Sequence, residues 1–395
     1  MKKVLFICSL YHPHVGGIET MITELSQFYR KQGIESVILT KKWPTVLAEE
    51  DEYKNTKIYR VISARTDDDF FNVSNWIKSN EEKIKADIIH VIGVRRPLPV
   101  FGLLLSRLWN VPLISTIAGS EIPHTGDPET YSIWDEGKDL MRPVIEASNL
   151  VTCVSRALEN DLQKIVPNIK LLRTIYAGID IKLINLTTCV EIEKNYIVSL
   201  RRLIPSKGID VLIKAFKDIV KEYPQVKLII AGDGSEEANL KFLVKNLELE
   251  DKIKFIGTVS MERCISLLKG ALCTVVPSLS EGGGLVNVEA QAASCPVVAS
   301  RVGGIPEYVE DTVSGLLFEA GNYKDLAEKL RKILSNDSLK NKLIKGGIRH
   351  AKKFSWDMLG PQYLALYDEM INIRKVETFK PWSDLVNKLW LNLRN

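Results

Sequence analysis

Residues 272–293 read LCTVVPSLSEGGGLVNVEAQAA, in which a short apolar run leads into three glycines and a helix-like segment. Glycine loses more conformational freedom on folding than any other residue, so three glycines directly before a helix require a structural reason. Glycines at a helix start let backbone N–H groups approach a phosphate, and the helix dipole favours the negative charge. We therefore expect a strand, a loop and a helix here, with phosphate-binding N–H groups at Gly283, Gly284, Leu285 and Val286.

Two glutamates flank this loop. Glu281 precedes the expected helix and Glu289 lies inside it, so both carboxylates face the same region. Carboxylates repel phosphate, but they accept hydrogen bonds from pairs of hydroxyl groups. The combination predicts a sugar–diphosphate–ribose ligand, whose hydroxyl groups are bound by the acids and whose phosphates are bound by the loop.

A diphosphate also needs cations, which the stretch SLRRLIPSKGIDVLIKAF (199–216) supplies. Arg201 and Arg202 follow the end of an expected strand, and Lys207 opens the next expected helix. Arginine offers a fixed fork to phosphate oxygens, and lysine offers a point charge. Solvated loop charges are the alternative for Arg201 and Lys207. Their position at the carboxyl end of a strand favours a role in binding.

The same alternation of short β-rich runs and helix-period segments extends along the chain. Continuous Val/Ile runs separated by helices indicate parallel strands that are buried on both faces. The expected strands are 3–9, 36–40, 57–62, 87–93, 112–117, 150–154 and 171–175 in the first half, and 195–200, 226–232, 252–257, 272–278, 296–300 and 315–319 in the second. Each half is therefore expected to form a doubly wound α/β domain.

The length of 395 residues also favours two domains over one hydrophobic core. Strand patterning lapses near residues 176–195, so we place the domains at 1–182 and 183–361. Two such domains that face each other leave a cleft at the carboxyl ends of their strands, where ligands bind in open α/β sheets.

The composition excludes several classes of partner. A net charge of +4, without a basic stripe interleaved with aromatic residues, disfavours a nucleic acid. The six cysteines form no CxxC pair and lie mostly in apolar runs, which predicts reduced thiols and a cytoplasmic protein. No run reaches the ~18 apolar residues of a membrane span, and the apolar run at 4–8 is too short for a secretory signal.

The last residues suggest one more helix. Trp382, Leu385, Val386, Leu389, Trp390 and Leu393 recur at helical spacing. A terminal helix packed on the body of the protein is expected here, and a helix that contacts a partner or the inner face of a membrane is the alternative. The oligomeric state stays open.

The amino-terminal half has a second glycine loop, in which Gly16 and Gly17 join the first strand to a helix. No GxGxxG fingerprint follows the first strand, so a nicotinamide cofactor is not expected. His12 and His14 lack acidic or cysteine companions, and the acids at 67–69 are expected in a solvated loop. We therefore expect no metal site.

Several segments together resemble the retaining GT-B glycosyltransferases of family 4, the glycosyl transferases group 1. They are SLRRLIPSKG (199–208), AGDG (231–234), FIGTV (255–259), PSLSEGGGLVNVEA (277–290) and PVVASRVGGIPE (296–307), in the order and spacing of that family. Glu281 and Glu289 fit its E-x7-E motif, and the resemblance runs from about residue 3 to residue 370.

The resemblance implies a role for each matching residue. Glu281 would bind the donor sugar, Glu289 the ribose, and Arg202 and Lys207 the diphosphate; Arg202, Lys207 and Glu281 would carry catalysis. Backbone donors would come from Gly284, Leu285 and Val286, and from Gly17 of the other domain; Ile256 and Thr258 would lie by the base. Helices within 362–395 would cross back to the first domain.

Two departures from the family pattern concern the sugar. In TIAGSE (116–121), Ala118 stands where many members have a histidine that is usually assigned to the transferred sugar or to catalysis. Gly119, Glu121 and His90 are the candidates that would compensate for this change. Gly283 replaces the usual aromatic residue of E-G-F-G, which implies a more open acceptor side.

The expected reaction transfers a glucose- or N-acetylglucosamine-type sugar from a nucleotide diphosphate, with uridine as the usual base of the family. An acceptor hydroxyl of a small molecule, glycan or lipid-linked molecule would receive it with retained configuration, by front-face departure of the diphosphate and without a metal. The polar segment 120–143 is the candidate acceptor loop. A sugar-nucleotide epimerase and a non-catalytic nucleotide-sugar-binding protein are the alternatives.

Overall fold

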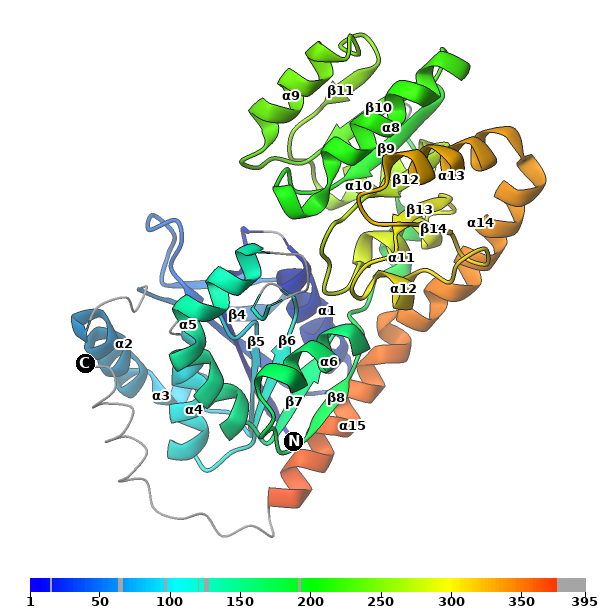
Figure 1. Ribbon diagram of the computed structural model, residues 1–395. Coiled ribbons are helices and arrows are strands. Elements are labelled where there is room, and N and C mark those ends of the chain that lie inside the picture. The colour runs from blue at the N-terminus through cyan, green and yellow to red at the C-terminus, as the bar shows by residue number, and fades with distance from the viewer. Residues whose placement is uncertain are drawn as a thin grey trace. The chain divides into compact units, whose positions relative to one another are not determined.

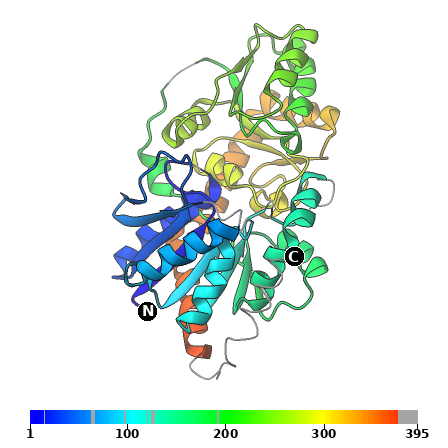
Figure 2. The same cartoon turned by 90° about the vertical axis from the view of Figure 1, so that its left-hand side faces the viewer.

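The computed structural model describes residues 1–14, 16–62, 67–95, 98–119, 121–123, 128–190 and 193–374. The chain divides into two compact units. Of the described residues, unit 1 holds 1–123, 129–176 and 359–374, and unit 2 holds Pro128 and Ala177–Met358. We had placed these divisions after residues 182 and 361. In both views of the molecule, helices lie on the two faces of each sheet (Figure 1, Figure 2).

Unit 1 contains an eight-stranded sheet of order β3-β4-β2-β1-β5-β6-β7-β8. All neighbouring strands are parallel except β3 and β4. The strands are β1 Lys3–Cys8, β2 Glu35–Lys41, β3 Glu50–Tyr53, β4 Thr56–Val61, β5 Ile88–Ile92, β6 Leu113–Ile117, β7 Leu150–Cys153 and β8 Leu172–Thr174. The helices are α1 Gly17–Lys31, α2 Asp67–Ser79, α3 Glu81–Ile84, α4 Leu98–Leu108, α5 Pro128–Ala147 and α6 Arg156–Ile165. A further helix, α15 Trp356–Arg374, belongs to unit 1 from Leu359 to its end.

Strand β3 is absent from the sequence prediction. Its four residues are EDEY, a charged segment without an apolar run. It pairs with β4 through a tight hairpin in which Lys54 and Asn55 have positive φ angles of 48° and 58°. A two-residue turn with positive φ at both positions fits the right-handed twist of the two strands that it joins. Charged residues are typical of a strand at the edge of a sheet.

Two expected loops of unit 1 are helices. The acids at 67–69 begin α2, and Pro128–Ala147 forms α5 across most of the segment that we expected to be an acceptor loop. Trp134 is buried within α5, whereas Tyr131 is exposed. The expectation of a polar loop is therefore wrong for this part of the segment; residues 120 and 124–127 lie outside the described residues.

Unit 2 contains a six-stranded, fully parallel sheet of order β11-β10-β9-β12-β13-β14. The strands are β9 Tyr196–Leu200, β10 Lys227–Ala231, β11 Ile253–Phe255, β12 Cys273–Val276, β13 Val297–Ser300 and β14 Leu316–Phe318. The helices are α7 Ile181–Leu186, α8 Ile209–Glu222, α9 Glu237–Asn246, α10 Met261–Gly270, α11 Leu285–Ala292, α12 Ile305–Tyr308, α13 Tyr323–Ser335 and α14 Asp337–Ala351; short 3₁₀ turns cover Pro205–Lys207 and Lys352–Phe354.

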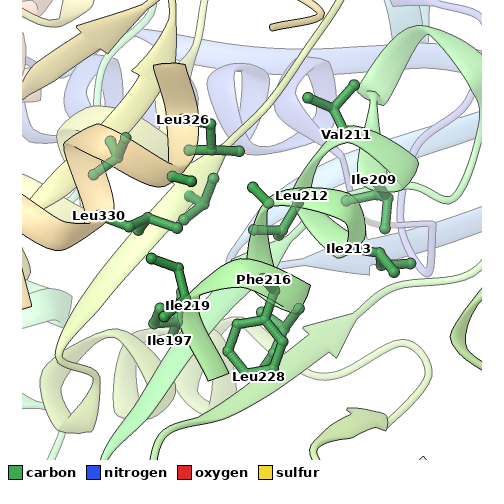
Figure 3. Close-up of a cluster of buried hydrophobic side chains, with 14 of the residues drawn as sticks. Ile197, Ile209, Val211, Leu212, Ile213, Phe216, Ile219, Leu228, Leu326 and Leu330 are labelled. Carbon is green, nitrogen blue, oxygen red and sulfur yellow. The ribbon is translucent and has the colours of Figure 1, made fainter. Parts of the chain in front are cut away.

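The core of unit 2 forms where α8 and α13 cover β9 and β10. The apolar residues of α8 recur at helical spacing and are buried, as are their partners on the sheet. Figure 3 shows Leu326 and Leu330 of α13 beside Leu212 and Ile219 of α8. This packing fixes the start of α8, and therefore the loop that joins it to β9.

The chain returns to unit 1 in α15. Beyond Leu359 this helix packs on α1 and β8, where Arg173 forms a two-contact ion pair with Glu369 at 2.6 and 2.7 Å. The expected helix at 382–393 lies outside the described residues. Within the part of the chain that is described, no helix has the length and apolar character needed to cross a membrane.

Candidate functional site

The candidate site lies in unit 2 at the carboxyl edge of its parallel sheet. The strand order runs from β9 towards β11 in one direction and from β12 towards β14 in the other. Ligands of open α/β sheets bind outside the carboxyl ends of the strands where the order reverses, which is between β9 and β12. Arg201 directly follows β9, whereas Ser278 and Glu281 follow β12, so the sheet brings these residues together.

Four side chains form what we call the Glu281 cluster: Arg201, Lys207, Ser278 and Glu281. Lys207 Nζ lies 3.0 Å from Glu281 Oε2, and the Ser278 hydroxyl donates to the same oxygen at 3.2 Å. A terminal guanidinium nitrogen of Arg201 donates to this oxygen too, and to Ser278 Oγ at 2.7 Å. The side chains of Arg201, Lys207 and Glu281 are 7%, 13% and 16% exposed, so their charges interact with little solvent screening.

The electrostatics of the cluster favour an anion. Burial alone would raise the pKa of the Glu281 carboxyl, but the charges of Arg201 and Lys207 outweigh it and hold the pKa well below its usual range. Burial lowers the pKa of the Lys207 ammonium, which Glu281 opposes. The cluster holds two cations against one carboxylate, so it can attract a further negative charge.

The glycine loop ends where the expected phosphate-binding helix begins. Helix α11 starts at Leu285, and Gly284 precedes it with φ +146°. A Cβ atom on Gly284 would lie 2.6 Å from Asn287 Nδ2, so this position excludes a side chain in both conformation and space. Among the described residues no side chain caps α11. Its first N–H groups, including those of Leu285 and Val286, are thus placed to bind an anion.

Glu289 lies one turn further along α11 and is half-buried. Burial raises the pKa of its carboxyl to about 7, although the charge of Arg201 opposes this shift. Glu281 and Glu289 both follow β12, but their surroundings shift the two pKa values in opposite directions. Glu281 stays ionised, whereas Glu289 titrates near neutral pH.

We expect the Glu289→Gln variant to reveal this titration. A carboxyl with an ordinary value of 4.5 and a folded-state pKa of about 7 binds more protons when folded, so its stabilising effect is lost as the pH rises through that window. The melting temperature of the wild type should fall relative to that of Glu289→Gln between pH 5 and 8. If the melting temperatures of the two proteins change with pH in the same way, the raised pKa does not belong to Glu289.

The residues expected near a base follow β10 and β11. The Ile256 N–H continues the ladder to Ile230 at 3.0 Å, and the Thr258 hydroxyl donates to Asp233 at 2.7 Å. Gly232 and Gly257 join the two loops by a backbone hydrogen bond of 2.8 Å. Ile256 and Thr258 therefore lie at the same sheet edge as the Glu281 cluster, beyond β9.

The structure separates the two neighbouring arginines. We expected Arg202 to bind the diphosphate; Arg202 is exposed and makes none of the contacts of the Glu281 cluster, so its role stays a prediction. The guanidinium in the cluster belongs to Arg201. The charge of Arg202 still reaches Lys207, whose pKa it lowers slightly after the larger effects of burial, Glu281 and Arg201. Ser278 also belongs to the cluster but was not predicted, because a single serine after a strand carries no recognisable sequence signal.

Gly17 lies in unit 1, where it begins α1 after an extended Gly16. His14 Nδ1 lies 2.9 Å from a carboxylate oxygen of Glu19, and the His12 ring stacks on Tyr53. Both histidines thus have partners outside the loop, Glu19 on α1 and Tyr53 on β3. Throughout the described ranges, no three His, Cys, Asp or Glu side chains gather closely enough to hold a metal ion.

His90 is not available to a sugar. It is fully buried on β5, where one ring nitrogen bonds to Tyr367 and the other lies 2.6 Å from the Thr116 hydroxyl. Burial lowers the pKa of its ring to about 3, so it stays neutral. The expectation that His90 compensates for Ala118 is wrong because both of its nitrogens serve the interior of unit 1.

Glu121 closes the loop that contains Ala118. Its carboxylate accepts hydrogen bonds from the N–H groups of Ala118 and Gly119 at 3.1 and 2.6 Å, and the residue is 3% exposed. A carboxylate therefore organises the place where the family resemblance expects a histidine. A contact of Gly119 or Glu121 with the sugar stays a prediction.

Comparison with known proteins identifies the family. The sequence model of glycosyl transferases group 1 matches residues 190–350, and that of glycosyltransferase family 4 matches residues 15–183. An uncharacterized glycosyltransferase of Methanocaldococcus jannaschii is 32% identical over 94% of this chain and 99% of its own length. The N-acetyl-alpha-D-glucosaminyl L-malate synthase of Bacillus anthracis is 26% identical over 83% of this chain and 87% of its length.

The solved structures agree on the fold. HepE of Anabaena, in a crystal structure with UDP-glucose, superposes with a TM-score of 0.76 at 21% identity, over 93% of this chain and 100% of that chain. The expected pair of Rossmann-like domains is confirmed, as is the class of enzyme. The chain belongs to the family 4 glycosyltransferases and has their GT-B fold.

Proposed function

We propose that this glycosyltransferase moves a glucose- or N-acetylglucosamine-type sugar from a UDP-linked donor to an acceptor hydroxyl, with retention of configuration. The observation that carries the proposal is the Glu281 cluster beside the uncapped start of α11. Lys207 and the N–H groups suit a diphosphate, and the flanking Glu281 carboxylate suits the hydroxyls of a sugar. The relatives support the choice, since one is named for an N-acetylglucosaminyl transfer and a fold neighbour was crystallised with UDP-glucose.

The proposed reaction is a front-face displacement. The bond between the sugar carbon and the diphosphate breaks first, and the growing negative charge on the leaving phosphate is stabilised by Lys207, Arg202 and the N–H groups of Leu285 and Val286. The acceptor hydroxyl then attacks the same face of the sugar and passes its proton to the leaving phosphate oxygen. Donors that are preorganised in this way are worth roughly 2.7–4 kcal/mol each.

Each glutamate has a separate part in this proposal. Glu281 accepts hydrogen bonds from hydroxyl groups of the donor sugar, and Glu289 accepts them from the ribose. Ile256 and Thr258 lie by the base. A phosphate contact of Gly17, which the family resemblance implies, stays a prediction. Because the cations of the protein perform the electrostatic work, we expect the reaction to proceed without a divalent metal ion.

Thermal unfolding with UDP, GDP or ADP at millimolar concentration, in the presence of EDTA, tests the donor site. A ligand at 100 times its dissociation constant adds about 2.7 kcal/mol of stability, so UDP should raise the melting temperature more than GDP or ADP. Glu289→Ala should reduce this shift, because it removes the acceptor for the ribose hydroxyls. If no nucleotide stabilises the wild type, the donor site is not where we place it.

An acceptor assay separates transfer from epimerisation. UDP-glucose and UDP-N-acetylglucosamine are offered with and without a panel of hydroxylated acceptors, beginning with L-malate because a relative is named for it. A transferase should form a glycoside only in the presence of an acceptor. Release of UDP with a rearranged free sugar, independent of any acceptor, would favour an epimerase, and binding without turnover would favour a non-catalytic protein.

A further inference from the structure

The carboxylate of Glu281 is held on one side only. Arg201, Lys207 and Ser278 all donate to the same oxygen, Oε2. Within the described part of the chain, Oε1 has no hydrogen-bond partner, and the side chain keeps 16% of its surface exposed. This arrangement fixes the orientation of the carboxylate and leaves one oxygen for an external donor.

Arg201 is the most firmly held of the three donors. Its N–H continues the sheet ladder to Ala231 at 2.9 Å, and a Cβ atom on Gly232 would lie only 1.9 Å from its carbonyl oxygen. Its side chain is 7% exposed and bridges Ser278 and Glu281. Its Nε is buried and has no hydrogen-bond partner among the described residues. An unsatisfied buried donor costs free energy, so the contacts of the guanidinium with Ser278 and Glu281 must offset that cost.

Lys207 serves Glu281 in a different way. Its ammonium lies on a flexible stem, 3.0 Å from the carboxylate, at the end of a short turn that leads into α8. A bound diphosphate would share the charge of this ammonium, which would weaken its hold on Glu281. Arg201 is then the counter-ion that remains in contact with the carboxylate.

We propose that Arg201 is a positioning residue for the donor sugar: it holds Oε2 of Glu281 in place, so that Oε1 accepts a hydrogen bond from a sugar hydroxyl. Arg202, which is exposed, would instead serve the diphosphate. This inference rests on the proposed function, because it assigns the sugar half of the same site.

The test compares UDP with UDP-glucose as probes, by calorimetric titration at pH 5 to 8. Arg201→Gln should weaken UDP only slightly, through the loss of one nearby positive charge, because the Arg201 guanidinium is engaged by Ser278 and Glu281 and UDP carries no sugar for Glu281. It should bind UDP-glucose roughly 10-fold more weakly, since a hydrogen bond to a charged acceptor is lost or misdirected. This weakening should grow as the pH falls, because Glu281 without Arg201 is protonated more readily.

The neighbouring Arg202→Gln is the matched control. It should weaken UDP and UDP-glucose by the same factor and leave the pH dependence unchanged. Arg201→Lys keeps the charge near Glu281 but has no fork to bridge Ser278, so it should restore the pH-independent binding of UDP-glucose in part. If Arg201→Gln does not fold, as melting curves would show, this second variant carries the test.

Three outcomes distinguish the proposals. Equal weakening of UDP and UDP-glucose by Arg201→Gln would make Arg201 a diphosphate ligand and overturn the inference. Unchanged binding of both probes would overturn it as well. If the wild type binds neither these probes nor the corresponding ADP and GDP pairs, the proposed donor site fails, which is a separate result from any behaviour of the variants.

Discussion

Replacing Lys207 with alanine should lower the rate of sugar transfer by about 100- to 1,000-fold, the usual cost of removing one preorganised donor from a developing oxyanion. The Lys207 side chain is 13% exposed, and its ammonium lies 3.0 Å from Glu281, in the loop that precedes α11. A water molecule that fills the space is neutral and cannot replace the lost positive charge. The measurement is kcat with UDP-glucose and an acceptor identified by the panel.

The fall should appear in kcat more than in the affinity for UDP. An interaction that strengthens as charge develops on the leaving group stabilises the transition state more than the bound ground state. Lys214→Ala is the matched control, because Lys214 lies on α8, directly after the turn that holds Lys207, but is exposed and pairs with Asp210 at 2.8 Å. Turnover near that of the wild type in a folded Lys207→Ala variant would remove Lys207 from the proposed mechanism.

Much of the fold could be predicted because buried parallel strands have a strong sequence signal. Every expected apolar run in both halves forms a strand, and the central strands, such as β1, β5, β9 and β12, are rich in buried Val, Ile and Leu because both of their faces are covered. Strand β3 had no such signal: it is held by a hairpin turn and by pairing with β4, and its residues are charged. The helices at 67–79 and 128–147 were missed for a related reason, because polar composition was taken as evidence for loops.

The site was predicted only as far as chain order allows. The spacing of Glu281, Glu289 and the glycine loop identifies residues that follow one strand, and the sheet order then brings Lys207 to them. The sequence pointed to Arg202 and did not predict that Arg201 contacts Glu281, because the direction of a side chain just beyond a strand depends on the path of the loop. His90 has the residue type of a sugar ligand, but its position in the middle of β5 commits it to the interior.

The largest effect on folding is expected from Gly303→Ala. Gly303 has φ +51°, and a Cβ atom there would lie 2.0 Å from the carbonyl oxygen of Glu281, a distance that no relaxed structure allows. Gly304 donates its N–H to this same carbonyl at 3.0 Å. The methyl group must therefore displace the backbone of Glu281 as well as strain its own. Together these terms cost about 3 kcal/mol, which lowers the melting temperature of a domain of this size by about 6–12 °C.

Gly321→Ala separates the two causes. Gly321 has a comparable φ of +81°, but the nearest atom to its Cβ position is Leu279 Cδ2 at 3.8 Å, an ordinary contact. This variant meets only the conformational cost of about 1 kcal/mol, or roughly 2–4 °C. Gly303→Ala should exceed it in destabilisation and should alone weaken UDP-glucose binding, because the displaced backbone carries the Glu281 carboxylate. Equal melting shifts with intact binding would mean that the loop relaxes around the methyl group, and that Gly303 is needed for its backbone angle and not for its contact with the site.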